Sequence, residues 1–206
     1  MQINSLALTV SGGILLLFSI TVLIHIIVIR PWYRTWGATP EECMMVLPGD
    51  EFIPSHSDVT TRAITIQSPA EKIWPWLLLI GVERAGFFSY YWMENLFGAA
   101  MPSENAPLPN REPLKLGDPV SMMGGGPPQT KLTVSRIEPG YTISFGGWTF
   151  SLKPVSPGST RLIVRYPFGV STAGDAAFFY GFFEIIHFIL ESGMMMGLKQ
   201  RAESAG

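Results

Sequence analysis

The chain has 206 residues and a formal net charge of −2, and 47% of its residues are hydrophobic while only 15% are charged. Because an average soluble domain has about 25% charged residues, we expect part of this chain to be solvated by something other than water. The small net charge, without any Lys/Arg run, excludes nucleic acid as an expected partner. The single cysteine, Cys43, excludes an internal disulfide and a cysteine-based zinc site.

Residues 6–29 lack charged side chains and predict a transmembrane helix. At about 1.5 Å per residue the stretch reaches about 36 Å, which is enough to cross a hydrocarbon core of about 30 Å. A cleaved signal peptide is the alternative. The sequence lacks the basic leading segment, the shorter apolar stretch and the small-residue cleavage site that such a peptide requires. We therefore predict a retained, single-pass anchor and interface over residues 1–34.

The basic and aromatic residues after this stretch predict the orientation of the anchor. Arg30 and Arg34 follow it, with Trp32 and Tyr33 between them, while no Lys or Arg precedes it. Aromatic residues favour the membrane interface, and basic residues favour the cytoplasmic side. We therefore expect the lipid bilayer as a partner, with Trp32 and Tyr33 in contact with the membrane or a partner protein. The soluble domain is expected on the cytoplasmic side of a bacterial inner membrane.

The residues after the anchor divide into a connector and one domain. Residues 35–59 contain several prolines and no periodicity, which is typical of a connector, and residues 60–206 form the domain. The sequence of residues 61–66 predicts a strand. A helix follows it, with Ser68 as the N-terminal cap and Glu71 reaching back to complete a capping box.

The rest of the domain is predicted to be a sheet with one long helix. A short helix is expected over residues 89–97 and a proline-rich loop over residues 101–119. In residues 131–166 apolar and polar side chains alternate between Pro-Gly and Gly-Gly turn signals, which predicts an antiparallel meander with one apolar face and one solvent-facing side. A helix over residues 175–202 is the only element long enough to cover the apolar face. The predicted fold class is α+β, a curved antiparallel sheet around a long C-terminal helix.

Three segments resemble a known superfamily. They are LPGDE at residues 47–51, TRAITIQSPAEKIWPWLLLIGVERAGFFSYYWMENLFG at residues 61–98 and GLKQRAE at residues 197–203. The chain resembles the polyketide cyclase/dehydrase-like branch of the START-related helix-grip superfamily (SRPBCC proteins), over residues 37–203. The resemblance implies a cavity between the sheet and the C-terminal helix for lipids, polyketides or other hydrophobic ligands, with catalysis in some members. Tyr91 stands where members with an SYDW motif have Asp, so any chemistry that depends on that Asp is in doubt here.

Glu184, His187 and Glu191 are the candidate acid–base residues, because their spacing places them on one stripe of the last predicted helix. One interpretation is a polar stripe that faces solvent. Another is a Glu184–His187 pair that transfers protons inside a hydrophobic cavity. A di-iron site would need a second Glu-x-x-His copy, and the sequence has only one, so we expect no metal and no cofactor.

Other side chains are candidates for ligand or partner contact. Arg84, Tyr90 and Glu94 are predicted to line the mouth of the cavity, and the predicted contacts to a ligand inside it are Trp148, Phe150 and His187. Four aromatic residues of the last predicted helix are expected to contact a partner or the bilayer: Phe178, Phe179, Phe182 and Phe183. A second transmembrane span there is the alternative, but buried glutamates would cost several kcal/mol and the sheet would lose its cover.

Three functions remain open from the sequence. The favoured one is a non-catalytic accessory subunit that docks on a larger membrane protein complex. The second is a carrier or sensor for a hydrophobic small molecule, such as a lipid, polyketide or pigment-like ligand. The third is a cyclase- or dehydratase-like enzyme that uses Glu184 and His187. A cavity filled by side chains would favour the subunit, and an open apolar cavity would favour the carrier or the enzyme.

Overall fold

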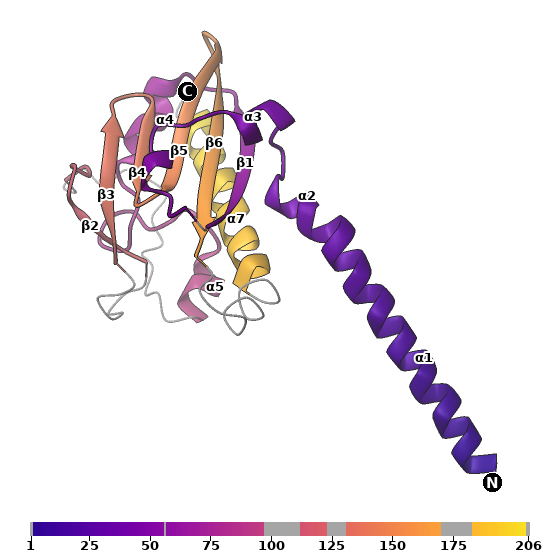
Figure 1. The fold of residues 1–206 in the computed structure, drawn as a ribbon. Helices are drawn as coiled ribbons and strands as arrows, with labels where there is room; N and C mark the ends of the chain where they lie inside the picture. The colour runs from indigo at the N-terminus through magenta and orange to yellow at the C-terminus, as the bar shows by residue number, and fades with distance from the viewer. Residues whose placement is uncertain (1, 56, 97–111, 123–130, 170–182, 205–206) are drawn as a thin grey trace.

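A computed structural model of the protein shows an α+β domain at the end of one long N-terminal helix (Figure 1). The residues that the structure describes are 2–55, 57–96, 112–122, 131–169 and 183–204. The predicted partner contacts Phe178, Phe179 and Phe182 lie outside them.

The N-terminal helix runs without a break into the domain. Helix α1 (Gln2–Ile24) continues through the π-helical turn η1 (His25–Ile29) into α2 (Arg30–Arg34). Within the described residues, one helix is long and apolar enough to cross a membrane, Val10–Arg34, with a mean hydropathy of 2.7 and none of its most apolar stretch buried. Its length and composition fit the predicted anchor, and the side of the membrane on which the domain lies stays a prediction.

Six antiparallel strands form one sheet in the order β1-β6-β5-β4-β3-β2. They are β1 (Asp58–Ile66), β2 (Pro119–Ser121), β3 (Lys131–Glu138), β4 (Thr142–Phe145), β5 (Trp148–Ser156) and β6 (Ser159–Phe168). The meander predicted over residues 131–166 is therefore confirmed. The sequence did not predict β2, whose first residue is a proline. A proline at the first position of a short edge strand removes no essential ladder hydrogen bond.

The polar face of the sheet is covered, so the prediction that it faces solvent is wrong. Thr142, Ser144, Thr149 and Ser151 are all buried. The segment before β1 lies over them, and it comes so close that a Cβ at Gly49, whose φ is 113°, would lie 2.5 Å from the hydroxyl of Thr149. The small hydroxyl side chains satisfy one another, as in the 2.9 Å bond between Thr142 and Ser151.

Two arginines of β6 hold this segment on the sheet, so it is part of the domain and not only a connector. The segment contains the short helices α3 (Pro40–Met44) and η2 (Asp50–Phe52). Arg161 binds the carboxylate of Glu42 at 2.7 Å, and Arg165 donates to the Met45 carbonyl at 3.0 Å.

Three helices lie on the apolar face or at its end: α4 (Ala70–Leu77), α5 (Tyr91–Leu96) and α7 (Glu184–Ser204). Figure 1 shows α7 running across the sheet, where Met194, Met195 and Leu198 are fully buried. This is the helix-grip arrangement predicted from the sequence. The capping box predicted for α4 is wrong, because Pro69 is the cap residue, and the Ser68 hydroxyl donates to the Ala202 carbonyl at 3.1 Å.

Candidate functional site

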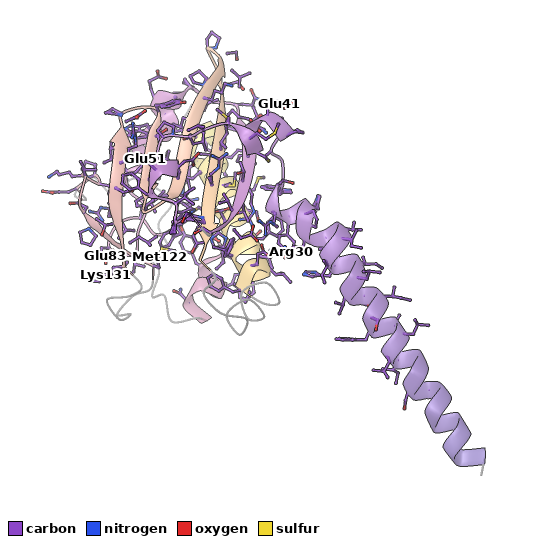
Figure 2. All side chains as sticks on the ribbon, in the orientation of Figure 1. Arg30, Glu41, Glu51, Glu83, Met122 and Lys131 are labelled. Carbon is purple, nitrogen blue, oxygen red and sulfur yellow. The ribbon has the colours of Figure 1, made fainter. Side chains whose placement is uncertain are left out.

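The first residue of α7, Glu184, binds the last turns of the anchor helix. Its carboxylate has no exposed surface. It accepts hydrogen bonds from Arg30 Nε at 2.8 Å, from the Tyr33 hydroxyl at 2.9 Å and from Arg34 Nη1 at 3.1 Å. Figure 2 shows Arg30 at the point where the helix reaches the domain.

Asp58, at the start of β1, completes this group of charges. Arg30 Nη2 donates to it at 2.9 Å, and Arg34 binds it through both terminal nitrogens. The hydrogen bonds from Arg34 hold the pKa of Asp58 below its usual value, against the opposing effect of burial. Two arginines therefore face two carboxylates, and we call Arg30, Tyr33, Arg34, Asp58 and Glu184 the latch.

A second buried ion pair lies deeper, between β1 and α7. Arg62 is completely buried and binds the carboxylate of Glu191 through Nη1. Its Nε donates to the Tyr33 carbonyl at 2.8 Å, and the indole nitrogen of Trp148 donates to Glu191 at 2.9 Å. Arg62 Nη2 is buried and has no hydrogen-bond partner among the described residues.

His187 lies beside this ion pair among aromatic rings. Its Nδ1 is 3.3 Å from Arg62 Nη1, and its ring centroid is 4.0 Å from that of Tyr166. Burial lowers the pKa of His187 to about 4, and the positive charge of Arg62 lowers it too, while Glu191 opposes the shift. His187 is therefore neutral near pH 7. Burial, with the negative charge of Glu191, raises the pKa of Tyr166 to about 12.

The solvent-facing stripe predicted on the last helix is wrong. Glu184, His187 and Glu191 are all buried. The contacts also do not form the predicted Glu184–His187 pair, because Glu184 binds the anchor helix while His187 lies against Arg62 and Tyr166. The spacing correctly placed the three residues on one face of the helix, and that face is turned toward the sheet and the anchor.

Arg84 and Tyr90, which were predicted at the mouth of a cavity, contact different parts of the fold. Arg84 joins two loops, because it donates to the Asp118 carboxylate at 3.1 Å and to the Glu112 carbonyl at 3.2 Å. Tyr90 is partly exposed and packs against α7, where a Cβ at Gly193 would lie 2.6 Å from its ring. Glu94 lies in α5, but its side chain is outside the part of the chain that the structure describes.

Aromatic side chains pack against one another between the sheet and α7. Trp148 and Phe150, predicted as ligand contacts, are buried, and their ring centroids lie 4.9 Å apart. Phe168 lies 4.8 Å from Tyr166 and 5.2 Å from His187. These residues form the core that joins the helix to the sheet.

The residues predicted to touch the membrane or a partner divide into two groups. Trp32 is exposed, and its contact with the membrane or a partner stays a prediction. Tyr33 is not, because its ring stacks on Phe188 at 5.6 Å and its hydroxyl binds Glu184, so that prediction is wrong. Phe183 lies 6.4 Å from Phe168, within the aromatic cluster.

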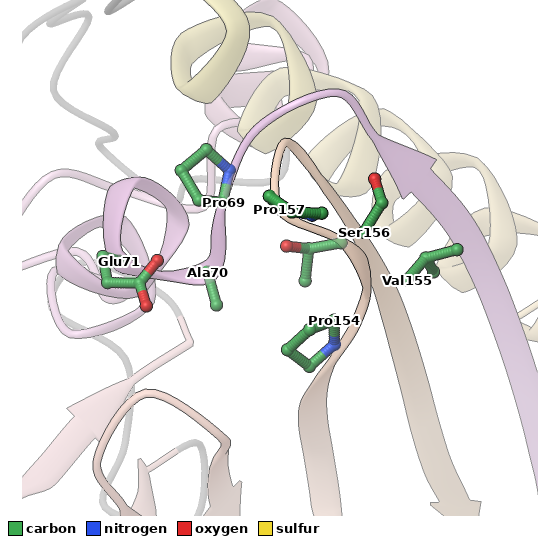
Figure 3. Close-up of a pocket in the computed structure, with 8 residues that line it drawn as sticks. Pro69, Ala70, Glu71, Pro154, Val155, Ser156 and Pro157 are labelled. Carbon is green, nitrogen blue, oxygen red and sulfur yellow. The ribbon is translucent and has the colours of Figure 1, made fainter.

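A shallow groove of about 250 Å³ lies between the start of α4 and the β5–β6 hairpin (Figure 3). It is lined by Pro69, Ala70, Glu71, Pro154, Val155, Ser156, Pro157 and Thr160. None of the predicted site residues lines it. Among the residues that the structure describes, no group of three or more His, Cys, Asp or Glu side chains is placed to hold a metal ion.

Arg30 and Arg34, which bind Glu184, and Arg62, which binds Glu191, were not predicted as site residues. One signal for Arg62 was present in the sequence: it alternates with Ile64 and Ile66 on one face of the strand, and an arginine on an apolar face needs a buried acidic partner. The acidic residues on the last helix were the candidates for that partner.

No protein-family model matches the chain, and no curated protein matches it. One similar solved structure is the solution NMR structure of a polyketide cyclase-like protein from Corynebacterium glutamicum. The two are 16% identical with a TM-score of 0.32, over 73% of this chain and 90% of that chain. At these values the likeness carries no argument about function, and the fold assignment rests on the sheet order and on the position of α7.

Proposed function

We propose that this chain is a non-catalytic accessory subunit of a membrane protein complex. Its helix-grip domain is held in a fixed orientation at the cytoplasmic surface of the bilayer. The observation that carries the proposal is the latch: the buried carboxylate of Glu184 binds Arg30 and Arg34 of the anchor helix. The residue that looked most like a catalytic acid therefore fastens the domain to its anchor.

The latch favours a presenting role over a freely moving one. A flexible linker would let a tethered domain sample many orientations. Here α2 enters the domain directly, and its arginines, Arg30 and Arg34, contact both β1 and α7. A domain fixed in this way shows the same surface to any neighbour in the membrane, which a subunit of an assembly requires.

The chemistry of the interior supports the same choice. Glu191 is held by Arg62 and Trp148, so its carboxylate is already coordinated. A general base is most effective when its pKa lies near the working pH, and the pKa of His187 is about 4. Aromatic rings occupy the described space beside it. These features favour a structural interior over the enzyme alternative.

One observation favours a hydrophobic-ligand carrier or sensor as the second candidate. Arg62 Nη2 is buried without a hydrogen-bond partner among the described residues. A buried donor without a partner destabilises the folded state by about 1–3 kcal/mol. A ligand oxygen that accepts a hydrogen bond from Arg62 Nη2 would remove this cost. Native mass spectrometry of the purified chain distinguishes the carrier, which retains one hydrophobic molecule, from a subunit that retains none.

The proposed function is tested by purifying the tagged full chain from its own membranes in mild detergent and measuring the mass and composition of the particle. We expect a particle that contains this chain and another membrane protein in a fixed ratio. Glu184→Gln should lower that ratio, while Glu71→Gln, at an exposed position outside the latch, should leave it unchanged. A particle with one chain alone, or with one chain and a hydrophobic small molecule, would contradict the subunit role.

A further inference from the structure

Apolar side chains are exposed at the point where the anchor helix leaves the domain. Trp32 of α2 is 57% exposed and Ile189 of α7 is 37% exposed. Ile185, one turn before Ile189, is partly exposed. The ring of Phe188, which neighbours Ile189 in the chain, lies 5.6 Å from the ring of Trp32. We call Trp32, Ile185 and Ile189 the rim.

The outward face of α7 changes in polarity along the length of the helix. Its outward positions are three or four residues apart and are, in order from the anchor end, Ile185, Ile189, Ser192, Met196, Gln200 and Glu203. A helix that covers a sheet in water is expected to be polar outward along its whole length. Here Ile185 and Ile189 lie nearest the anchor, Ser192 and Met196 follow, and the last two positions, which begin about 16 Å beyond Ile189, are polar. The end of this face nearest the anchor is therefore apolar and its far end is polar.

The latch determines what the rim faces. Because Arg30 and Arg34 bind Glu184, the first turn of α7 lies within hydrogen-bonding distance of the last turn of the anchor. The domain therefore cannot move away from the bilayer without breaking buried ion pairs. The charges at this end are matched, with Asp58 and Glu184 opposite the two arginines. An apolar surface beside matched charges is suited to the boundary between headgroups and acyl chains, where Trp side chains concentrate.

We infer that the rim rests in the headgroup–acyl boundary of the bilayer and forms a second lipid contact beside the anchor itself. This inference rests on the membrane anchor of the proposed function and goes beyond it, because it assigns the occupant of the rim. The occupant is lipid and not a protein partner. The anchor and the rim contact the bilayer at two separate places. Together they fix the tilt of the domain relative to the membrane.

The experiment uses the purified full chain in phosphatidylcholine vesicles, with nitroxide labels at single cysteines in a Cys43→Ser background. One variant carries Ile189→Cys in the rim. Its matched control carries Gln200→Cys, which is exposed on the same face of the same helix. Electron paramagnetic resonance measures the collision of each label with oxygen, which concentrates in the bilayer, and with a nickel chelate, which stays in water.

We expect the ratio of oxygen to nickel collisions to be several-fold higher for the label at position 189 than for the label at position 200. A water-like ratio at position 189, in a chain that co-floats with the vesicles after alkaline washing, overturns the lipid contact and leaves the anchor intact. A chain that does not co-float overturns the anchor of the proposed function, and the rim contact with it. Tryptophan-monitored unfolding of both labelled variants, compared with the Cys43→Ser parent, verifies that they are folded.

Discussion

Replacing Glu184 by Gln tests the attachment between the anchor and the domain. The amide has nearly the size of the carboxylate, so packing is retained while the negative charge is lost. Arg30 and Arg34 then keep Asp58 as a carboxylate partner. Tyr33 can still donate to the amide oxygen, so the loss falls mainly on the two arginines.

The expected magnitude follows from how well the latch is shielded from water. Removing one partner of a buried ion pair costs about 3–5 kcal/mol, because the other charge stays buried alone. The side chains of Arg30 and Arg34 are 23% and 14% exposed, so water and Asp58 compensate for part of this loss. We expect Glu184→Gln to lower the free energy of unfolding by about 2–3 kcal/mol. The exposed control Glu71→Gln should change it by no more than about 0.5 kcal/mol.

The assay is urea unfolding of the full chain in mild detergent, followed by tryptophan fluorescence. A double-mutant cycle with Arg34→Gln isolates the pair, and a coupling energy above about 0.5 kcal/mol is expected because the two side chains are in contact. Equal stability of Glu184→Gln and Glu71→Gln would refute the reasoning. The solvent-facing stripe predicted from the sequence would then describe the protein better than the latch does.

Three further predictions concern pH, packing and topology. The pKa of His187 is about 4 when folded and about 6.5 when unfolded. The unfolded chain therefore binds the proton first as the pH falls, and stability should drop by about 3 kcal/mol between pH 6.5 and pH 4. A His187→Gln variant, followed by the same unfolding assay, should lose that part of the pH dependence, and an unchanged profile would contradict it. Gly197→Ala should destabilise the fold in the same assay, because its Cβ would lie 1.9 Å from the Phe88 carbonyl oxygen, while Gly158→Ala, in open space, should not. A reporter that is active only in the periplasm, fused to the C-terminus, should stay silent in a bacterial host.

The strands and the last helix were predictable because their signals are local. Alternation of apolar and polar residues sets the faces of β4 and β5, and the turn between them requires two residues with positive φ. Gly146 and Gly147 supply these, with φ of 61° and 98°. Each of these features depends on residues only a few positions apart, so the pattern and the structure agree.

The surroundings of the acidic stripe were not predictable from the same kind of pattern. Spacing shows that Glu184 and Glu191 share a face of one helix, but not what that face meets. The answer lies far away in the chain, because Glu184 binds Arg30 and Glu191 binds Arg62. For the same reason the polar face of the sheet was predicted to face solvent. The segment before β1 covers it, and the sequence of that segment shows no periodicity that would indicate this.

We expect Arg30 and Arg34 to have two roles, one in orienting the anchor and one in the folded latch, which can be tested separately. Topology is set during insertion, before the domain has folded, so both arginines then act as unpaired positive charges. After folding they bind Asp58 and Glu184, and their charges are balanced. Glu184→Gln should therefore weaken the folded protein and leave the silent C-terminal reporter silent. Replacing both arginines by Gln should weaken the fold and also activate the reporter in part of the population, because neither residues 1–5 nor residues 30–61 would then carry a Lys or Arg to favour one orientation. A reporter that stays silent in the double arginine variant would show that these two residues do not set the orientation.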